Sequence, residues 1–362
     1  MLCEALAAEG NEVEVFTTDA GLEQEPEIPR GRPVDRGGVK ATYFPRVPGM
    51  GIRCPELEKA VRARVREFDL IHVTGVWQRT APAAYRVALE AGVPLVVSPR
   101  GALSRYSWTQ RRWRKLAYFI LRERPALRRA AGIHYTSKLE QEESRPYRFR
   151  ARTTVIANPV DTVFWARDPA GAERWRQQHG FSGADRIAFY AGRLEPKKNL
   201  NLLIPVLARA STWNLVFLGY NERGQVERLR REAARLGCGP RLRILPDARA
   251  EDLRSAYSAA DVLVLPSHHE NFANSAVEAV ACGCPALLSG RVGCAEELQS
   301  RGWAEILPLE TEAWVAAWGA IRPGRRIDPD GLGEVVSPRA CARATGEFYG
   351  KVLNDFPSKS NR

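Results

Sequence analysis

The chain has 362 residues, 44% of them hydrophobic and 27% charged, a composition typical of a soluble protein with two cores of ordinary size. It contains no run of roughly 18 apolar residues, which excludes a membrane-spanning helix on the pattern alone. Seven cysteines, an odd number, argue against a disulfide framework, and no secretory signal follows Met1. The sequence therefore predicts a cytoplasmic protein.

The net charge of +12 is concentrated in residues 100–152, which contain fifteen Lys or Arg against four Glu. Trp, Tyr and Phe are interspersed there, a composition that suits a helix on an anionic bilayer surface. Nucleic acid is the alternative partner, but no helix-turn-helix, RNP or zinc-finger pattern accompanies the charge. A general preference for arginine is a third explanation, since Arg outnumbers Lys 46 to 8.

Strand and helix patterns alternate along the chain, which predicts parallel pairing and an α/β architecture. The first series has strands over 12–18, 39–45, 69–73, 94–98, 132–136 and 153–157, with helices over 57–68 and 81–91 and in the basic segment. The second series has strands over 186–191, 214–218, 241–245, 261–265 and 285–289.

Four parts follow from this order. Residues 1–160 form the first domain and 161–337 the second, with an irregular connection over 158–184 that contains two prolines. A last helix, within 338–356, is expected to pack back toward the first domain. Residues 357–362 are expected to form a frayed tail.

A prospective anion-binding group follows the strand at 186–191. Gly192 lets the backbone pass close to a ligand, and Arg193, Lys197 and Lys198 gather at what the pattern predicts to be a helix N-terminus. Cations oppose the helix dipole there, so the conflict indicates an anionic ligand rather than a solvated basic turn. Arg and Lys are both suited to a phosphate.

Two carboxylates, Glu270 on a loop and Glu278 on the short helix that follows, are separated by seven intervening residues. Ser275 with Glu278 matches a capping box, and the N–H groups of Asn274 and Ser275 would face a phosphate. Taken alone, Glu270 is explained as a solvated loop acid and Glu278 as the partner in a helix cap. Together, at the carboxyl end of a sheet, they predict that one binds a sugar and the other a ribose. Cys282, Cys284 and Cys294 lack a zinc spacing and are interpreted as small hydrophobic residues.

The segments GRLEPKKN (192–199) and PSHHENFANSAVEAVACGCPAL (266–287) resemble the donor-binding half of retaining GT-B glycosyltransferases of family 4. The resemblance extends upstream through weaker motifs: LAAEGNEVEVFTT (6–18), DLIHVTG (69–75), VVSPRGAL (96–103), IHYTSKLEQE (133–142) and VIANPVD (155–161). It implies two Rossmann-like domains whose parallel sheets face each other across a cleft.

The resemblance also assigns roles. It implies that Arg193 and Lys198 hold the diphosphate and stabilise it as leaving group, that Glu270 contacts the donor sugar, and that Glu278 binds the ribose hydroxyls. The other donor contacts would come from Gly192, Phe272, Ala273, Asn274 and Ser275. Such enzymes need no metal and no cofactor beyond the co-substrate, a UDP- or GDP-linked sugar.

The segment Pro99–Leu103, followed by Trp and basic residues, is most similar to members that build bacterial exopolysaccharide or lipopolysaccharide. This implies a glycan or lipid-linked acceptor, approached by Arg100 and Gly101, and a protein peripheral on the inner face of the plasma membrane. Three positions depart from the family: Ala273 and Pro159 replace Gly, and Arg100 stands where many relatives carry His.

Relatives begin with a strand and a Gly-Gly loop, whereas this sequence begins within the helix that follows them. The first strand of the first domain is therefore expected to be missing, which would leave two unpaired sheet edges. A misplaced start codon would explain this, and so would an inactive remnant. The alternative function is accordingly a degenerate, non-catalytic GT-B protein that binds nucleotide or a partner glycosyltransferase. A related epimerase is a third reading, without support from the basic segment. The base, sugar, acceptor, linkage and oligomeric state stay open.

Overall fold

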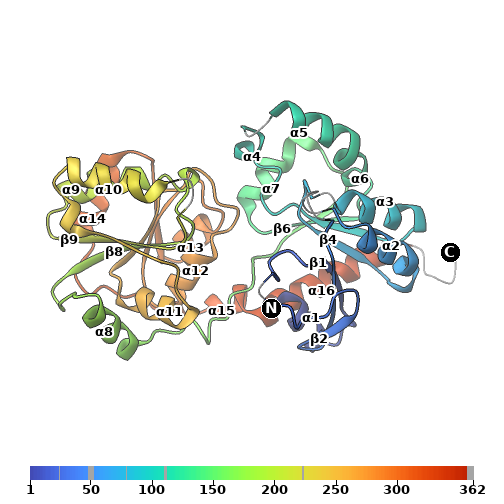
Figure 1. The fold of residues 1–362 in the computed structure, drawn as a ribbon, viewed down its shortest axis with the longest axis horizontal. Helices are drawn as coiled ribbons and strands as arrows, with labels where there is room; N and C mark the ends of the chain where they lie inside the picture. Colours follow the sequence, from blue (N-terminus) through green and yellow to red (C-terminus); the bar gives the residue numbers. More distant parts are fainter. Residues whose placement is uncertain (24, 48–52, 79, 110–111, 222–223, 357–362) are drawn as a thin grey trace. The chain divides into compact units, whose positions relative to one another are not determined.

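The computed structural model describes residues 1–23, 25–47, 53–78, 80–109, 112–221 and 224–356. The predicted tail at 357–362 and two positions of the basic segment, Gln110 and Arg111, lie outside these ranges. The chain divides into two compact units, one made of residues 1–159 and the segment from 338 onward, the other of residues 160–337 (Figure 1). Within the described ranges, no helix is sufficiently long and apolar to pass through a bilayer.

The first unit contains two sheets. A three-stranded sheet has the order β1-β3-β2, with β1 (Glu14–Thr18) parallel to β3 (Val39–Phe44) and β2 (Pro33–Arg36) antiparallel to it. A four-stranded parallel sheet has the order β4 (Ile71–Thr74), β5 (Leu95–Ser98), β6 (Gly132–Tyr135) and β7 (Arg152–Val155). The helices of this unit are α1 (Leu2–Ala8), α2 (Pro55–Arg64), α3 (Ala81–Ala91), α4 (Arg105–Thr109), α5 (Arg112–Tyr118), α6 (Arg124–Leu127), α7 (Lys138–Ser144) and α16 (Pro338–Asn354).

The two unpaired edges expected from the sequence are β1 and β4. In the described part of the chain, β1 pairs only with β3 and β4 only with β5. No residue of β1 or β4 is fully buried, whereas β5 and β6 are buried at every position. Parallel strands of α/β proteins are normally covered on both faces, so β1 and β4 are less protected than the central strands β5 and β6.

The C-terminal helix α16 completes the core of the first unit. Phe348 and Val352 of α16 cluster with Val96 of β5 and with Ile156. Gly132, the first residue of β6, lies directly beneath the helix: a Cβ there would come within 2.7 Å of Phe348 Cζ and 3.1 Å of Val352 Cγ2. The contact therefore requires a residue without a side chain.

The second unit is built on one six-stranded parallel sheet with the order β10-β9-β8-β11-β12-β13. The strands are β8 (Arg186–Ala191), β9 (Trp213–Leu218), β10 (Leu242–Leu245), β11 (Val262–Leu265), β12 (Ala286–Ser289) and β13 (Ala304–Leu307). The helices are α8 (Pro169–Gln178), α9 (Leu203–Arg209), α10 (Gln225–Arg235), α11 (Ala250–Ala259), α12 (Asn274–Ala281), α13 (Ala295–Ser300), α14 (Thr311–Ala320) and α15 (Leu332–Val336). The strand order reverses between β8 and β11, the point at which open α/β sheets bind ligands.

The predicted irregular connection at 158–184 is wrong in its middle, where α8 forms. Asp168 is the N-cap and accepts a hydrogen bond from Gly171 N over 2.9 Å, and Pro169 is the first helical residue. Proline is favoured at this position because the first N–H of a helix has no partner within the helix, so its absence breaks no hydrogen bond. Strands β2 and β13 were also not predicted, since both are short and partly polar.

We expect Gly132→Ala to lower the free energy of unfolding by about 1–3 kcal/mol, because the added methyl group forces apart β6 and α16. Gly346→Ala, in α16 itself, is the control: nothing lies within 4 Å of the added Cβ. It should stabilise by about 0.5–1 kcal/mol, since glycine is unfavourable inside a helix. Denaturant titration of the full chain measures both, and a Gly132→Ala variant as stable as wild type would contradict the packing described.

Candidate functional site

A buried ion pair lies at the carboxyl edge of the second sheet. Lys198 Nζ contacts Glu270 Oε1, and each side chain is only 12% exposed. The Ser267 hydroxyl donates to the same carboxylate oxygen over 3.2 Å. Two opposite charges removed from water together depend on each other, because loss of one leaves the other buried and unpaired. The structure thus brings together two residues that lie 72 positions apart in the sequence.

Backbone hydrogen bonds join the loops that carry this pair. His268 N donates to Lys197 O over 3.0 Å, which links the loop after β11 to the loop after β8. Glu270 N donates to Arg291 O over 2.8 Å, and Gly293 N donates to Glu270 O over 3.1 Å. Since β8, β11 and β12 are neighbours in the sheet, their three loops form one connected surface.

Gly192 leaves β8 with a φ of +140°, a conformation that side chains disfavour. Its N–H donates to Leu218 O, over 3.0 Å, so the chain turns directly over the end of β9. Gly219 follows β9, and a Cβ on it would lie 2.1 Å from Gly192 O. Two glycines therefore meet here, and the sequence analysis identified only the first. Gly219 has no motif of its own, and its neighbour is visible only in three dimensions.

The helix predicted to start around the basic residues is wrong. Pro196–Lys198 forms a single 3-10 turn, Asn199 has a φ of +53°, and α9 begins only at Leu203. The cations therefore do not oppose a helix dipole, and that part of the prediction fails. Lys198 turns inward instead, toward Glu270.

Arg193 and Lys198 differ in position. The Arg193 side chain is 63% exposed, with Nη2 3.4 Å from Glu195 Oε1. Its carbonyl oxygen accepts a hydrogen bond from the Tyr190 hydroxyl over 2.7 Å, which fixes the backbone of the turn. Burial lowers the pKa of the neighbouring Lys197. An exposed arginine and an enclosed lysine thus follow the same turn, one accessible to solvent and the other not.

The start of α12 differs from the predicted capping box. Ala273 is the N-cap, its side chain has no polar atom, and Ser275 is the second helical residue. Ala273 has a φ of +78°, a left-handed conformation that costs an alanine about 1–3 kcal/mol. The departure from Gly seen in the sequence therefore falls on a position whose backbone favours Gly. Phe272 is buried next to it, and its carbonyl oxygen accepts from Cys294 N over 3.0 Å.

Glu278 projects from α12 toward α11. The Tyr257 hydroxyl lies 3.3 Å from Glu278 Oε2 and donates to it. Burial raises the pKa of Glu278 to about 7, and the tyrosine hydrogen bond opposes this rise. Tyr257 was missed in the sequence because nothing in α11 marks it as a ligand-side residue. A carboxyl group that titrates near neutral pH can accept hydrogen bonds from a ligand when it loses its proton.

Arg100 and Gly101, predicted on the acceptor side, lie in the first unit after β5. Arg100 has a φ of +55° and contacts Asn158 Oδ1, and its buried Nε has no hydrogen-bond partner among the residues that the structure describes. Gly101 N donates to Glu140 Oε1 over 2.6 Å, and the other oxygen of Glu140 accepts from Thr136 N over 2.7 Å. The buried Glu140 therefore fixes this loop, a role that the sequence analysis did not find.

The three neighbouring cysteines of the second unit, Cys282, Cys284 and Cys294, are buried and unbridged. Burial raises the pKa of the Cys282 and Cys284 thiols to about 12. Among the residues that the structure describes, no three His, Cys, Asp or Glu side chains gather as a metal site.

Comparison with known families assigns both halves of the chain. Residues 1–159 match the glycosyl transferase 4-like domain, and residues 171–305 match glycosyl transferases group 1. The D-inositol 3-phosphate glycosyltransferase of Mycobacteroides abscessus is 28% identical over 215 residues, which cover 57% of this chain and 48% of that protein. This chain thus spans about half the length of that relative.

Solved structures share the whole fold. Sucrose-phosphate synthase from Thermosynechococcus elongatus aligns with a TM-score of 0.76 at 22% identity, over 98% of this chain and 92% of that one. Anabaena Alr3699/HepE in complex with UDP and glucose aligns with a TM-score of 0.67 at 22% identity, over 98% and 93%. The two Rossmann-like units thus have the fold of GT-B glycosyltransferase structures, and each half of the chain resembles a glycosyltransferase domain.

We expect Ala273→Gly to raise the free energy of unfolding by about 1 kcal/mol, because glycine relieves the left-handed strain at the N-cap of α12. Ala276→Gly, inside the same helix, serves as control and should destabilise by about 1 kcal/mol. Thermal and denaturant unfolding of the full chain measure both. Destabilisation by both substitutions would show that the conformation of Ala273 carries no strain.

Proposed function

We propose that the chain is a retaining glycosyltransferase that moves a hexose from a nucleotide-diphosphate sugar to a glycan or lipid-linked acceptor in bacterial surface polysaccharide synthesis. The observation that carries the proposal is the enclosed Lys198–Glu270 pair. It stands between the Gly192 turn and α12, and both flank the switch point of the sheet. The complex of Anabaena HepE with UDP and glucose supports a nucleotide-linked donor.

In the proposed reaction, Lys198 and Arg193 neutralise the diphosphate as the bond between the sugar C1 and the phosphate oxygen breaks. The acceptor oxygen forms its bond to C1 on the same face, and its proton passes to the leaving phosphate. Glu270 holds the sugar hydroxyls, and the first N–H groups of α12, at Asn274 and Ser275, point at the phosphates. These positive groups substitute for a metal ion, so we propose a metal-independent enzyme.

Glu278 is proposed to accept hydrogen bonds from the ribose. Its position on the second turn of α12, four residues after Asn274, leaves the N-terminus of the helix for the phosphates. The Ala273 backbone and Phe272 would shape the loop between sugar and phosphate. Arg100 and Gly101 are proposed to shape the acceptor side through the backbone of their loop, since the Arg100 side chain is directed toward Asn158.

We also propose peripheral association with the inner face of the plasma membrane through the basic segment 100–152. The segment keeps its positive charge at the surface: Arg105, Arg122, Arg124, Arg128 and Arg129 are all exposed. Anionic lipid headgroups attract such clusters, and the attraction weakens with salt.

The second candidate is a non-catalytic GT-B protein that binds nucleotide or a partner glycosyltransferase. The split sheet of the first unit favours it, because β1 and β4 end in unpaired edges within the described chain. Nucleotide-sugar binding without turnover by the wild-type chain would favour this candidate over the first.

We expect Glu270→Gln to reduce transfer by about 100-fold or more, because the sugar loses a charged hydrogen-bond partner and Lys198 loses its counter-charge. Lys198→Met should have an effect of similar size. Release of nucleoside diphosphate from a panel of UDP- and GDP-sugars measures this. Glu305→Gln, on the exposed side of β13, is the matched control and should keep full activity. Unchanged turnover of folded Glu270→Gln protein would refute the catalytic assignment.

We expect binding of an intact UDP- or GDP-hexose to release protons near pH 7. The pKa of Glu278 in the free protein is about 7, so about half of these groups carry a proton at that pH. Ribose hydroxyls that donate to the carboxylate favour its charged form and lower its pKa. Release should therefore reach about half a proton per site at pH 7 and vanish toward pH 9, where the group is already ionised.

Calorimetry in two buffers of different ionisation enthalpy measures this release. An intact nucleotide sugar is used because its diphosphate has no group that titrates in this range. Glu278→Gln should remove the buffer dependence while Glu305→Gln keeps it. Identical buffer dependence in wild type and Glu278→Gln would exclude Glu278 from the donor site.

A further inference from the structure

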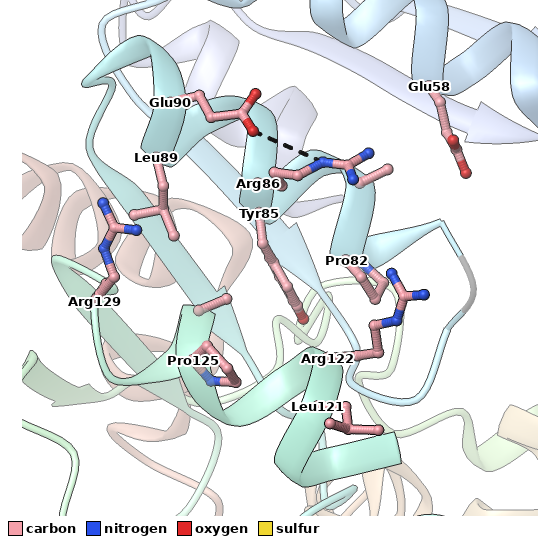
Figure 2. A pocket seen from close by; sticks show the side chains of 12 residues that line it. Glu58, Pro82, Tyr85, Arg86, Leu89, Glu90, Leu121, Arg122, Pro125 and Arg129 are labelled. Atoms are coloured by element: carbon pink, nitrogen blue, oxygen red, sulfur yellow. Dashed lines mark ion pairs between the residues drawn. The ribbon is translucent and has the colours of Figure 1, made fainter. Parts of the chain in front are cut away.

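A pocket of about 380 Å³ lies in the first unit, between α3 and the helical stretch that runs from α5 to α6. Its floor includes the fully buried Tyr85, and Arg122 and Arg129 stand on either side of this ring (Figure 2). Arg86 of α3 contributes a third guanidinium group to the lining. The pocket belongs entirely to the first unit, whereas the donor residues belong to the second.

The charge of the pocket favours an anion. Two acids, Glu58 and Glu90, line it together with the three arginines. Glu90 is shared between Arg86, at 4.0 Å, and Arg62, at 3.3 Å, so its charge is already offset. In the described part of the chain, neither Arg122 nor Arg129 forms an ion pair. Their guanidinium groups are therefore available, and this is the group that matches phosphate oxygens in paired hydrogen bonds.

An exposed apolar stripe adjoins the same pocket. Leu121 lines the pocket and is 73% exposed, and Ile120 beside it is 46% exposed. Leu116, at 37%, and Trp113, at 78%, continue the stripe at helical spacing. Four of the eight exposed large hydrophobic side chains in the described chain thus lie within nine residues. An exposed apolar patch of this kind, beside a basic pocket, indicates a surface that binds an apolar partner outside the chain.

We propose that this pocket binds the phosphate headgroup of an anionic phospholipid, with Leu121 and Ile120 entering the acyl region next to it. A free phosphate would match the arginines but not the stripe, and an apolar partner would match the stripe but not the arginines. A phospholipid presents both chemistries at the required adjacency. This pocket would be the lipid-binding site within the membrane association proposed for residues 100–152, on which it rests. It does not depend on glycosyl transfer.

The experiment compares two double variants that remove the same charge from the same helical stretch. Arg122→Gln with Arg129→Gln changes the pocket, whereas Arg124→Gln with Arg128→Gln changes exposed arginines outside it. Co-sedimentation of the full chain with phosphatidylcholine vesicles, with and without phosphatidylglycerol, measures partitioning. We expect the pocket pair to weaken binding to the anionic vesicles about 30-fold and the matched pair less than about fivefold.

Two further arms separate the sources of phosphate. Leu121→Gln keeps every charge and should also weaken vesicle binding, because its side chain would no longer enter the acyl region. Calorimetry with soluble glycerol 3-phosphate should show no binding comparable to that of the vesicles. Unchanged thermal unfolding and unchanged UDP- or GDP-hexose binding show that each variant is folded.

If both double variants lose the same amount of binding to anionic vesicles, the pocket is not the lipid site, and diffuse attraction by the basic segment explains the binding instead. Arginine-dependent binding of glycerol 3-phosphate, unaffected by Leu121→Gln and without vesicle binding, would overturn the lipid and leave a free phosphate. Equal binding to neutral and anionic vesicles would overturn the role of charge. None of these outcomes concerns turnover, so they are distinguishable from failure of the proposed enzyme activity.

Discussion

The close approach of two backbones at the ends of β8 and β9 is the constraint on which the candidate site depends. Gly219 leaves room for Gly192 O at a distance that no Cβ could tolerate. Because the chain crosses there, the turn that follows β8 returns along the carboxyl edge of the sheet toward β11. Lys198 lies at the end of that turn and contacts Glu270 on the loop that follows β11. Parallel pairing supplies the rest, since it sends all six strand ends to one edge.

The Lys198–Glu270 pair explains how a site of high charge stays stable without a ligand. Each charge loses most of its water and receives the other as partner, so neither is buried alone. In the proposed function, a nucleotide sugar would offer phosphate oxygens to the lysine and hydroxyl donors to the carboxylate in one molecule. Binding would then exchange one set of partners for another rather than add contacts. Such an exchange fixes orientation more than it raises affinity, and orientation is what the proposed transfer step uses.

Eleven of the thirteen strands in the described chain were predictable to within two residues, because buried strands are short apolar runs. Glu270, Glu278 and Lys198 were identified because they belong to two contiguous segments, and their roles stay predictions. The residues that the sequence analysis missed are those whose role depends on contacts with other elements. Gly219, Tyr257 and Glu140 act on partners in other elements, and no local pattern marks them.

Two helix starts were predicted wrongly because local sequence signals there point to different structures. Proline ends a helix in its interior but starts one at its first position, and in α8 the Asp168 cap decides for the second case. Ser275 and Glu278 have the spacing of a capping box, yet the N-cap of α12 is the left-handed Ala273, two residues earlier. The first error overlooked a local cap, whereas the second arose from a backbone conformation that residue preference does not favour.

The order of the elements along the chain has a consequence for the first unit. Its core is completed by α16, which follows the entire second unit in the sequence. Until α16 is added, Val96 and Ile156 lack the cover of Phe348 and Val352, and β4 already has one unpaired edge. The first unit therefore gains these apolar contacts only after the second unit has been synthesised, although most of the first unit is synthesised before it. The salt bridges from Arg339 and Arg343 to Glu9 then join α16 to α1, so the two ends of the described chain stabilise one unit.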